Sequence, residues 1–474
     1  MKLDLKQGAY QARSPIANAQ VCINLYPEPN PPDAPFPMTH YPAPGLRLAR
    51  DYSAYGNQVR GIYVASNGEP FCVVGQTLLD IAFNTVIGTL PTNSGNPVSM
   101  CDNGTTMVIV DGTSYGGTVP LAAATPGSLT PIVDPGFYGS DRVDFIDTFL
   151  VFNQPGTGNF YTTTSNVVTP FDPLYFASKE GWNDLLVCAC CLHDNIWLLG
   201  QSTTEIWYNA GGATFPFARM PNSILQQGCV AVHSPVVADN ALYWLSQDRW
   251  GHNLCMRGEG YAAKRISTFA IEDIWSTYST ISDAIGMVYQ TGGHETIGFY
   301  FPSANAWWAY DASTQLWYRR TYDGLNNAWL PYCMGYERPI FASGKYSAIY
   351  AGDRLTGTLY VLEKDAYTDN GAPITRQRSW AHVQQDGNRL YHSRFAANMT
   401  GAALSPDTVT LDWSDDAGQT YGAPVNQTVN NQTDGQYLWR RLGYARDRVY
   451  RLTWSGAGEC ALNGAYIDVG PGAT

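Results

Sequence analysis

Four residues in the stretch "CACCLH" have the types that bind zinc. Cys188, Cys190, Cys191 and His193 offer three sulfurs and an imidazole, and a structural zinc site uses four such ligands in a tetrahedron. The flanking residues are apolar and typical of a strand, in which successive side chains point to opposite faces. Cys188 and Cys190 would therefore face away from Cys191 and His193. We interpret these cysteines as core residues and predict no metal site.

Other spacings that would indicate catalysis are missing from the sequence. There is no H-E-x-x-H, no phosphate-binding P-loop, no G-x-G-x-x-G after a strand and no G-x-S-x-G nucleophile turn. We therefore predict no catalytic residue, no cofactor and no enzymatic activity.

One stretch, "DWSDDAGQTY", carries a recognisable turn pattern in Ser414, Asp416 and Gly418. It resembles the Asp-box turn of sialidase-type β-propellers. In such a turn the Ser and Asp side chains bond the backbone, while glycine supplies a positive φ. A sialidase also needs an arginine cluster and a Tyr/Glu pair, and no spacing here points to either. We interpret the stretch as a structural hairpin turn.

The composition favours an all-β fold with more than one domain. A chain of 474 residues is too long for one core. Charged residues make up 14%, below the roughly 25% of an average soluble protein, while Gly, Tyr and Trp are abundant. The net charge of −12 opposes a free-standing nucleic-acid binder.

Ten cysteines are too few for a disulfide framework, so we expect reduced, buried thiols. Neither a secretory leader nor a membrane span is expected.

The sequence pattern divides the chain into three parts. Residues 1–55 form an extended arm rich in proline, which excludes helix and central strand. Its apolar residues indicate that it lies against another surface. Residues 56–365 repeat strand pairs at intervals of roughly 36 to 55 residues, typical of a β-propeller. We predict six or seven irregular blades, with first-hairpin turns near Asn67, Asn103, Asp147, Asp194, Asp239, His294 and Lys345.

The third part, residues 366–474, has alternating strands without the blade rhythm and predicts a β-sandwich-like domain. One helix is predicted at "STFAIEDIWSTY", with Ser267 or Thr268 as its cap. Trp307, Trp308, Trp317 and Trp329 are interpreted as packing between blades, although a sugar-stacking platform stays open.

A basic concentration near the end of the chain has two interpretations. It is a solvated edge, or a contact with an acidic neighbour or DNA phosphate. The possible contact residues are Arg440, Arg441, Arg446, Arg448 and Arg451.

The start of the chain resembles one known family. "ARSPIANAQVCINLYPEP" is similar to the opening of the tail hub, or nozzle, proteins of short-tailed bacteriophages, also called packaged-DNA stabilisation proteins or tail accessory factors. Weaker likenesses follow in order at "VRGIYV", "KRISTFAIEDI", "GGHETIGFYFPSANAWWAYDASTQLWYRR" and "LWRRLGYARDRVYRL". The positions that match the family's opening motif are Arg13, Ser14, Gln20, Asn24, Leu25, Tyr26, Pro27 and Glu28.

The resemblance implies a structural role in a virion tail. Members form a homohexamer below the portal and its adaptor ring. This ring extends and closes the DNA channel, stabilises packaged DNA, and serves genome ejection. It implies as partners a tailspike or tail fibre, a tail needle or plug, and double-stranded DNA that passes without sequence recognition. It further implies a late protein assembled in the bacterial host cytoplasm.

Two alternatives remain open from the sequence. One is a propeller-type carbohydrate- or receptor-binding module, which would expose aromatic side chains over a pocket. The other is a glycoside hydrolase, which would place paired carboxylates in the propeller mouth.

Overall fold

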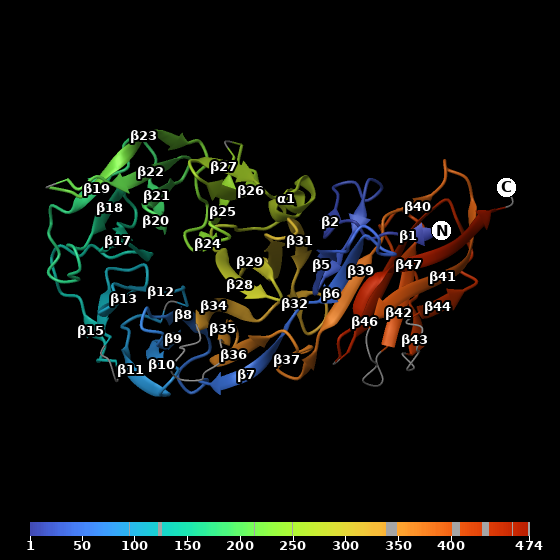
Figure 1. Ribbon diagram of the computed structural model, residues 1–474, viewed down its shortest axis with the longest axis horizontal. Helices are drawn as coiled ribbons and strands as arrows, with labels where there is room; N and C mark the ends of the chain where they lie inside the picture. The colour runs from blue at the N-terminus through green and yellow to red at the C-terminus, as the bar shows by residue number, and fades with distance from the viewer. Residues whose placement is uncertain are drawn as a thin grey trace.

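The computed structural model describes all residues except 94, 122–125, 213, 249, 338–347, 401–407, 429–435, 457 and 473–474. The molecule is elongated, with a ring of β-sheets at one end and a β-sandwich at the other (Figure 1). Both chain termini lie at the sandwich end. The all-β fold predicted from the composition is confirmed: strands dominate, and α1 (Phe269–Ser276) is the one α-helix in the described part.

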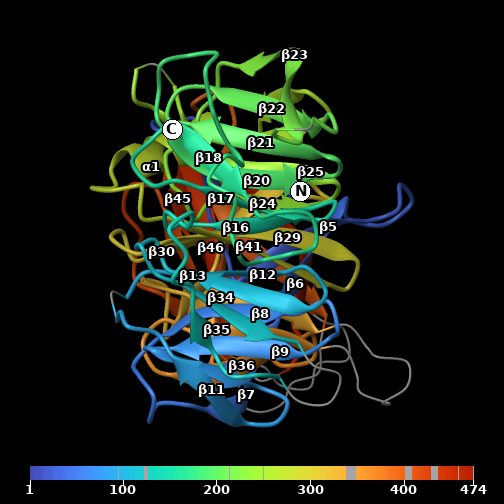
Figure 2. The same ribbon diagram turned by 90° about the vertical axis from the view of Figure 1, so that its left-hand side faces the viewer.

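Five blades of the propeller are four-stranded antiparallel sheets of their own. The first three contain β8 (Val59–Val64), β9 (Pro70–Val74), β10 (Thr77–Asp80) and β11 (Thr85–Thr89); β12 (Ser99–Asp102), β13 (Thr106–Val110), β14 (Gly116–Pro120) and β15 (Thr130–Pro131); and β16 (Val143–Ile146), β17 (Phe149–Asn153), β18 (Asn159–Thr162) and β19 (Phe176–Ser178). The next two contain β20 (Leu186–Leu192), β21 (Asn195–Gly200), β22 (Thr204–Asn209) and β23 (Phe217–Leu225); and β24 (Val236–Ala238), β25 (Ala241–Gln247), β26 (Asn253–Glu259) and β27 (Ala262–Arg265). Figure 2 shows these blades from the side away from the sandwich.

Two further blades belong to larger sheets, which gives seven among the described strands, within the predicted range. One contains β28 (Ile285–Thr291), β29 (His294–Phe301), β30 (Ala306–Asp311) and β31 (Leu316–Arg319). The other contains β34 (Pro331–Glu337), β35 (Ala348–Asp353), β36 (Thr358–Glu363) and, as its outermost strand, β7 (Gly45–Asp51). Because β7 comes from the N-terminal segment, the ring is closed by strands from both ends of the propeller sequence.

The first hairpins of the blades, where their turns are described, turn at the polar residues that the sequence analysis named or beside them. Asp147, His193 and Asp239 adopt positive φ values of 54°, 52° and 44° in such turns, a conformation that Asp, Asn and His tolerate best among residues with a side chain. The predicted turns near Asn67, Asn103 and His294 also join the first two strands of their blades. The turn predicted near Lys345 lies outside the described residues.

Helix α1 follows the blade that ends with β27. Thr268, one of the two predicted caps, accepts a hydrogen bond from the Ile271 N–H at 3.4 Å. The helix buries Ile271 and Trp275 against the adjacent blades.

The C-terminal β-sandwich, predicted from its alternating strands, has two sheets. One joins β41 (Leu390–Thr400), β44 (Gln436–Arg440), β45 (Tyr444–Ala445) and β47 (Ala461–Pro471) to β1 (Lys2–Leu3), β5 (Leu25–Pro29) and β6 (Met38–Pro42). The other contains β39 (Thr375–Ser379), β40 (Val383–Gln384), β42 (Thr408–Ser414), β43 (Val425–Thr428) and β46 (Asp447–Ser455).

The arm lies against its own chain and joins the two bodies. Its strand β4 (Cys22–Ile23) pairs with β31 of a blade on one side and with β39 of the sandwich on the other. A single ten-stranded sheet therefore runs from the propeller into the sandwich. The small ribbon β2 (Tyr10–Gln11) and β3 (Ala19–Gln20) lies nearby. Short strands β32 (Thr321–Tyr322), β33 (Asn327–Ala328), β37 (Thr368–Asp369) and β38 (Ala372–Pro373) complete the junction.

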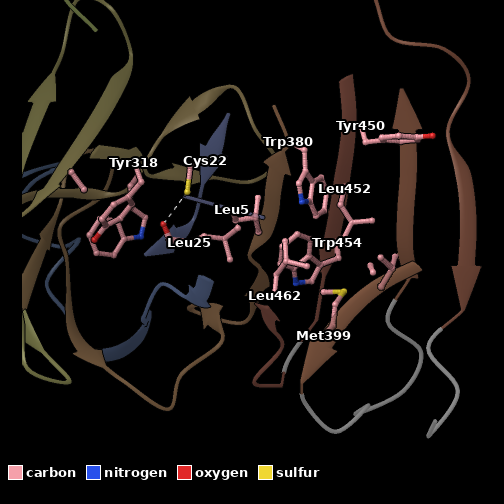
Figure 3. Close-up of a cluster of buried hydrophobic side chains, with 14 of the residues drawn as sticks. Leu5, Cys22, Leu25, Tyr318, Trp380, Met399, Tyr450, Leu452, Trp454 and Leu462 are labelled. Carbon is pink, nitrogen blue, oxygen red and sulfur yellow. Dashed lines mark hydrogen bonds between the residues drawn. The ribbon is translucent and has the colours of Figure 1, made fainter. Parts of the chain in front are cut away.

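The largest hydrophobic core is shared by all three parts. Leu5, Cys22 and Leu25 of the arm are fully buried within it. Figure 3 shows them between Tyr318 of the propeller and Trp380 of the sandwich. Burial raises the pKa of the Cys22 thiol to about 11, and this thiol donates to the Leu25 carbonyl at 3.5 Å. The arm is thus a component of the core.

Truncation of one arm side chain tests this shared core. We expect Leu5→Ala to lower the free energy of unfolding by about 2–5 kcal/mol, because a buried Leu leaves a cavity. Leu48→Ala is the matched control, since the Leu48 side chain in β7 is half exposed. Chemical denaturation of both variants measures the difference. Equal, small effects would show that the arm does not contribute to the core.

Candidate functional site at the seam between propeller and sandwich

The Asp-box-like turn follows β42 and is held together by its own side chains. The Ser414 hydroxyl donates to Asp416 at 2.6 Å and accepts from the Gly418 N–H at 2.8 Å. Asp416 also accepts from the Thr420 N–H at 2.8 Å. These hydrogen bonds lower the pKa of Asp416 to about 2, and the bond from Ser414 has the largest effect. Every functional group of the motif is therefore used in shaping the turn.

The tip of this turn packs on the arm. Gly418 has a φ of +89°, and a Cβ on it would lie 2.5 Å from the Cβ of Ala19. Ser379 of β39 adds two hydrogen bonds of 2.7 Å, accepting from the Val21 N–H and donating to the Ala19 carbonyl. The sandwich thus fixes arm residues 19–21 from two sides.

The propeller contacts the arm just as closely. Gly8 lies so near the backbone of Trp317 that any Cβ would collide with the Trp317 carbonyl. The next residue, Ala9, donates its N–H to that carbonyl at 2.6 Å. Only a glycine permits this approach of two backbones.

Asn24, one of the family-motif positions, is fully buried where the three parts meet. Its amide donates to the Thr321 hydroxyl and to the Thr375 carbonyl, both at 2.8 Å, and its Oδ1 accepts from the Thr321 N–H at 2.9 Å. Its φ of 56° is one that Asn adopts more readily than most residues. Asn24 therefore ties the arm to the propeller and to the start of the sandwich.

The other motif positions are distributed along the arm. Arg13 pairs with Asp273 of α1 at 2.8 Å on the surface, and Ser14 is exposed in a loop. Gln20 is buried against Arg378. Tyr26, Pro27 and Glu28 lie on β5, where the Tyr26 ring packs on His294 at 4.9 Å between centroids. The structure brings Gln20, Asn24 and Tyr26 to the seam and leaves Arg13 and Ser14 at its surface.

Arg378 of β39 is fully buried and holds the arm through neutral acceptors. Its guanidinium donates to the carbonyls of Gln7 (2.6 Å), Val21 (2.9 Å) and Ser379 (2.7 Å), and to the side chains of Gln20 (2.8 Å) and His40 (3.2 Å). Burial lowers the pKa of Arg378, and burial together with this cation lowers the pKa of His40 well below its usual value. The imidazole is therefore neutral and accepts.

Two histidines clamp the arm in the same manner, one from each body. His294 of the propeller contacts Asp311 at 2.6 Å and Glu28 of the arm at 3.4 Å. His382 of the sandwich contacts Asp447 at 2.8 Å and the Pro15 carbonyl of the arm at 2.8 Å. Each ring faces oxygen atoms on both nitrogens. The hydrogen bond to Asp311 raises the pKa of His294, so proton binding at His294 and arm docking are coupled.

The five C-terminal arginines fall into two groups. Arg448 is buried and donates both arms of its guanidinium to Asp415, at 2.6 and 2.8 Å. Arg451 pairs with Asp412 and lies 3.5 Å from the centre of the Tyr421 ring. Arg440, Arg441 and Arg446 are exposed. Their side chains are therefore the members of the cluster that present charge at the surface.

The remaining candidate residues are packed in the core. All ten cysteines are free thiols, and Cys188 and Cys190 belong to one core cluster while Cys191 packs on another. Trp307, Trp308, Trp317 and Trp329 are at most 2% exposed, which confirms packing rather than a sugar platform. Within the described residues no group of three His, Cys, Asp or Glu side chains could hold a metal. No helix in that part is long and apolar enough to cross a membrane.

Sequence reasoning missed Gly8, Arg378 and His382. Gly8 and Arg378 contact residues of another part of the chain that lie more than 300 positions away. A pattern of neighbouring residues in the sequence does not indicate contacts between residues so far apart along the chain. The two arginines in the stretch "ITRQRSW", which has an apolar residue at each end, are the one feature that could have indicated a buried cation.

Comparison with protein families gives two matches that together cover most of the chain. Residues 1–367 match the family model described as "Bacteriophage P22 Gp10, beta-propeller". Residues 375–470 match the model described as "Bacteriophage P22 Gp10, beta-sandwich". No curated protein matches in sequence.

Several solved structures align with the chain at low identity. The extracellular domain of the hybrid two-component system BT4673 from B. thetaiotaomicron aligns with a TM-score of 0.43 and 11% identity, covering 70% of this chain and 41% of that one. The N-terminal domain of Nup159 aligns at 0.40 with 7% identity, covering 72% and 98%. The WD40 propeller of Doa1 aligns at 0.40 with 11% identity, covering 68% and 97%.

The contact between the turn and the arm can be tested at Gly418. We expect Gly418→Ala to lower the free energy of unfolding by about 1–3 kcal/mol. The residue must keep a positive φ, and an added Cβ would collide with the Cβ of Ala19. Gly422→Ala, in the same hairpin, is the control because its nearest neighbour beyond the adjacent residues is 3.7 Å away. Denaturant titration measures both. A cost shared equally by the two variants would contradict the packing role.

The clamp at His294 predicts a pH dependence. Its hydrogen bond to Asp311 raises the pKa of His294 above the usual 6.5. A raised folded-state pKa contributes stability that is complete below pH 6.5 and is lost as the pH rises through the folded value. We expect His294→Gln to remove this part of the decline in unfolding free energy above pH 6.5. His252→Gln, at an exposed histidine, serves as control. A decline unchanged in His294→Gln would refute the clamp.

Proposed function

This chain belongs to the bacteriophage P22 Gp10 family of phage tail hub and DNA-stabilisation proteins, and from this membership we propose that it forms the nozzle ring of a short tail. In this role six copies would assemble below the portal and its adaptor ring. The assembly would extend and close the DNA channel, hold a tailspike or fibre and a needle or plug, and release the genome at ejection.

One observation carries the proposal: the two family models follow each other along the chain in the order that the fold shows. The propeller match ends at residue 367 and the sandwich match begins at 375. This junction is where β37 and β38 lead from the last blade into β39. The likeness therefore covers both bodies, and the gap between the two matches falls at their junction, as expected for a protein with the family's structural role.

The chemistry of the site supports assembly rather than turnover. The carboxylates of Asp416, Asp311 and Asp415 are all engaged in turns or ion pairs that fix the fold. The net charge of −12 also suits a channel wall, because DNA that makes few contacts with cations slides with little resistance. We place the exposed Arg440, Arg441 and Arg446 against an acidic protein neighbour.

The proposal is tested with DNA-filled particles that carry portal and adaptor but lack this protein. Added protein should form a sixfold ring at the portal vertex, visible by averaged electron microscopy, and DNA leakage should stop. Particles that bind no ring and continue to leak would refute the proposal and would lead to a glycan-binding screen.

A charge-reversed variant sharpens this test. Arg440→Glu combined with Arg441→Glu should prevent ring formation while the chain stays folded, because both side chains are exposed. Lys264→Glu, exposed on β27 of a blade, is the matched control and should assemble normally.

A further inference from the structure

A cavity of about 340 Å³ opens where arm, propeller and sandwich meet. The arm contributes Gln20 to Ile23, helix α1 contributes Ile271 and Ile274, and the blade contributes Trp308 and Arg319. Gly418 of the Asp-box-like turn and Arg451 line the sandwich side. Its size is at the lower end of the range for ligand pockets, roughly 300–1,000 Å³.

The cavity combines apolar and polar walls. Ile271, Trp308 and Cys22 are at most 2% exposed and form apolar surface. Gln11 and Asn326 also line the cavity, and a side-chain amide can both donate and accept. Such a mixture suits an extended peptide, whose backbone needs donors and acceptors while its side chains need apolar contact.

Arg319 supplies a cation that the fold leaves without a counter-ion. Its guanidinium lies 5.8 Å from the centre of the Trp308 ring, and its buried Nε has no hydrogen-bond partner. Among the described residues no carboxylate forms an ion pair with it, and burial lowers its pKa. The side chain is partly buried, and a cation in such a place that lacks a counter-ion favours pairing with an anion.

The second arginine of the cavity shows the contrast. Arg451 is held by both oxygens of Asp412 and stacks on Tyr421. Its charge is therefore compensated within the fold, whereas that of Arg319 is available to a ligand.

We propose that this cavity binds a carboxylate side chain carried by an extended segment of a partner protein. The carboxylate pairs with the guanidinium of Arg319, whose planar fork fits two carboxylate oxygens. An apolar neighbour of the acidic residue packs on Ile271 and Trp308, and Gln11 and Asn326 bond the segment's backbone. The segment contacts arm, propeller and sandwich at once, so its binding stabilises the docked arm.

The experiment uses the full chain and three probes. These are the capped tripeptide acetyl-Leu-Glu-Leu-amide, its Leu-Gln-Leu counterpart and inorganic phosphate. Calorimetric titration up to about 10 mM covers the weak end of specific recognition. We expect saturable binding of the Glu peptide, at least about tenfold weaker binding of the Gln peptide, and a thermal shift with the Glu peptide alone.

Variants locate the binding in the cavity. Arg319→Gln should weaken binding of the Glu peptide by at least about tenfold. Asn326→Asp should do so as well, and because Asn326 is exposed this change keeps the fold. Arg440→Gln, an exposed arginine outside the cavity, should bind like the unchanged chain.

Three results would overturn the proposal. They are no saturable binding of the Glu peptide, equal binding of the Gln peptide, and phosphate binding of equal strength with the same dependence on Arg319. The last would mark a phosphate site rather than a peptide site.

Discussion

The burial of the Arg378 guanidinium is the constraint on which the joined structure depends. This cation reaches from the sandwich into the arm, and its five acceptors are carbonyls, one amide and one neutral imidazole. Four of them belong to the arm. If the arm left, the guanidinium would lose four of its five acceptors. The arm is therefore held by these charge-assisted hydrogen bonds as well as by its apolar contacts.

The other features of the seam follow from this placement. Because Arg378 fixes Gln7, Gln20 and Val21, the segments on either side must approach both bodies closely. Gly8 permits the approach to Trp317, and Gly418 permits the approach of the turn to Ala19. Asn24 then satisfies the buried backbone where the three parts meet. The Asp-box-like turn, which resembles a turn of sialidase-type propellers, here packs against the arm at Ala19 and positions it.

The sequence predicted the local parts of this structure well. Turn residues such as Asp147 and Asp239 marked the blades because hairpin turns need their conformational tolerance. Thr268 marked the helix start for a similarly local reason. The sequence also indicated an arm that lies on a surface, and quoted Gln20 and Asn24 as motif positions. The turn and helix predictions rest on contacts between residues close in sequence, whereas Gln20 and Asn24 were identified through the family resemblance, and their contacts lie hundreds of positions away.

The seam itself could not be predicted in the same way. Ile23 pairs with Gln377 and with Arg319, both about 300 or more positions away, and two-residue strands have no periodicity to detect. Arg448 was grouped with surface arginines because nothing in its strand shows that Asp415 lies opposite. Proline content correctly excluded helix in the arm, yet β5 and β6 form a hairpin within the sandwich sheet, where their prolines are accommodated.

The continuous sheet through β4 connects the propeller and the sandwich mechanically, which matters for a tail hub. Force on the sandwich reaches the propeller through the backbone pairs of Cys22 and Ile23, since these join β39 to β31. Two residues make few such pairs, and the contacts of Arg378, His294 and His382 with the arm, together with the shared hydrophobic core, add to them. Each of these three side chains contacts the arm. None of the three contacts described joins the propeller directly to the sandwich. Release of the arm would therefore remove contacts from both bodies together.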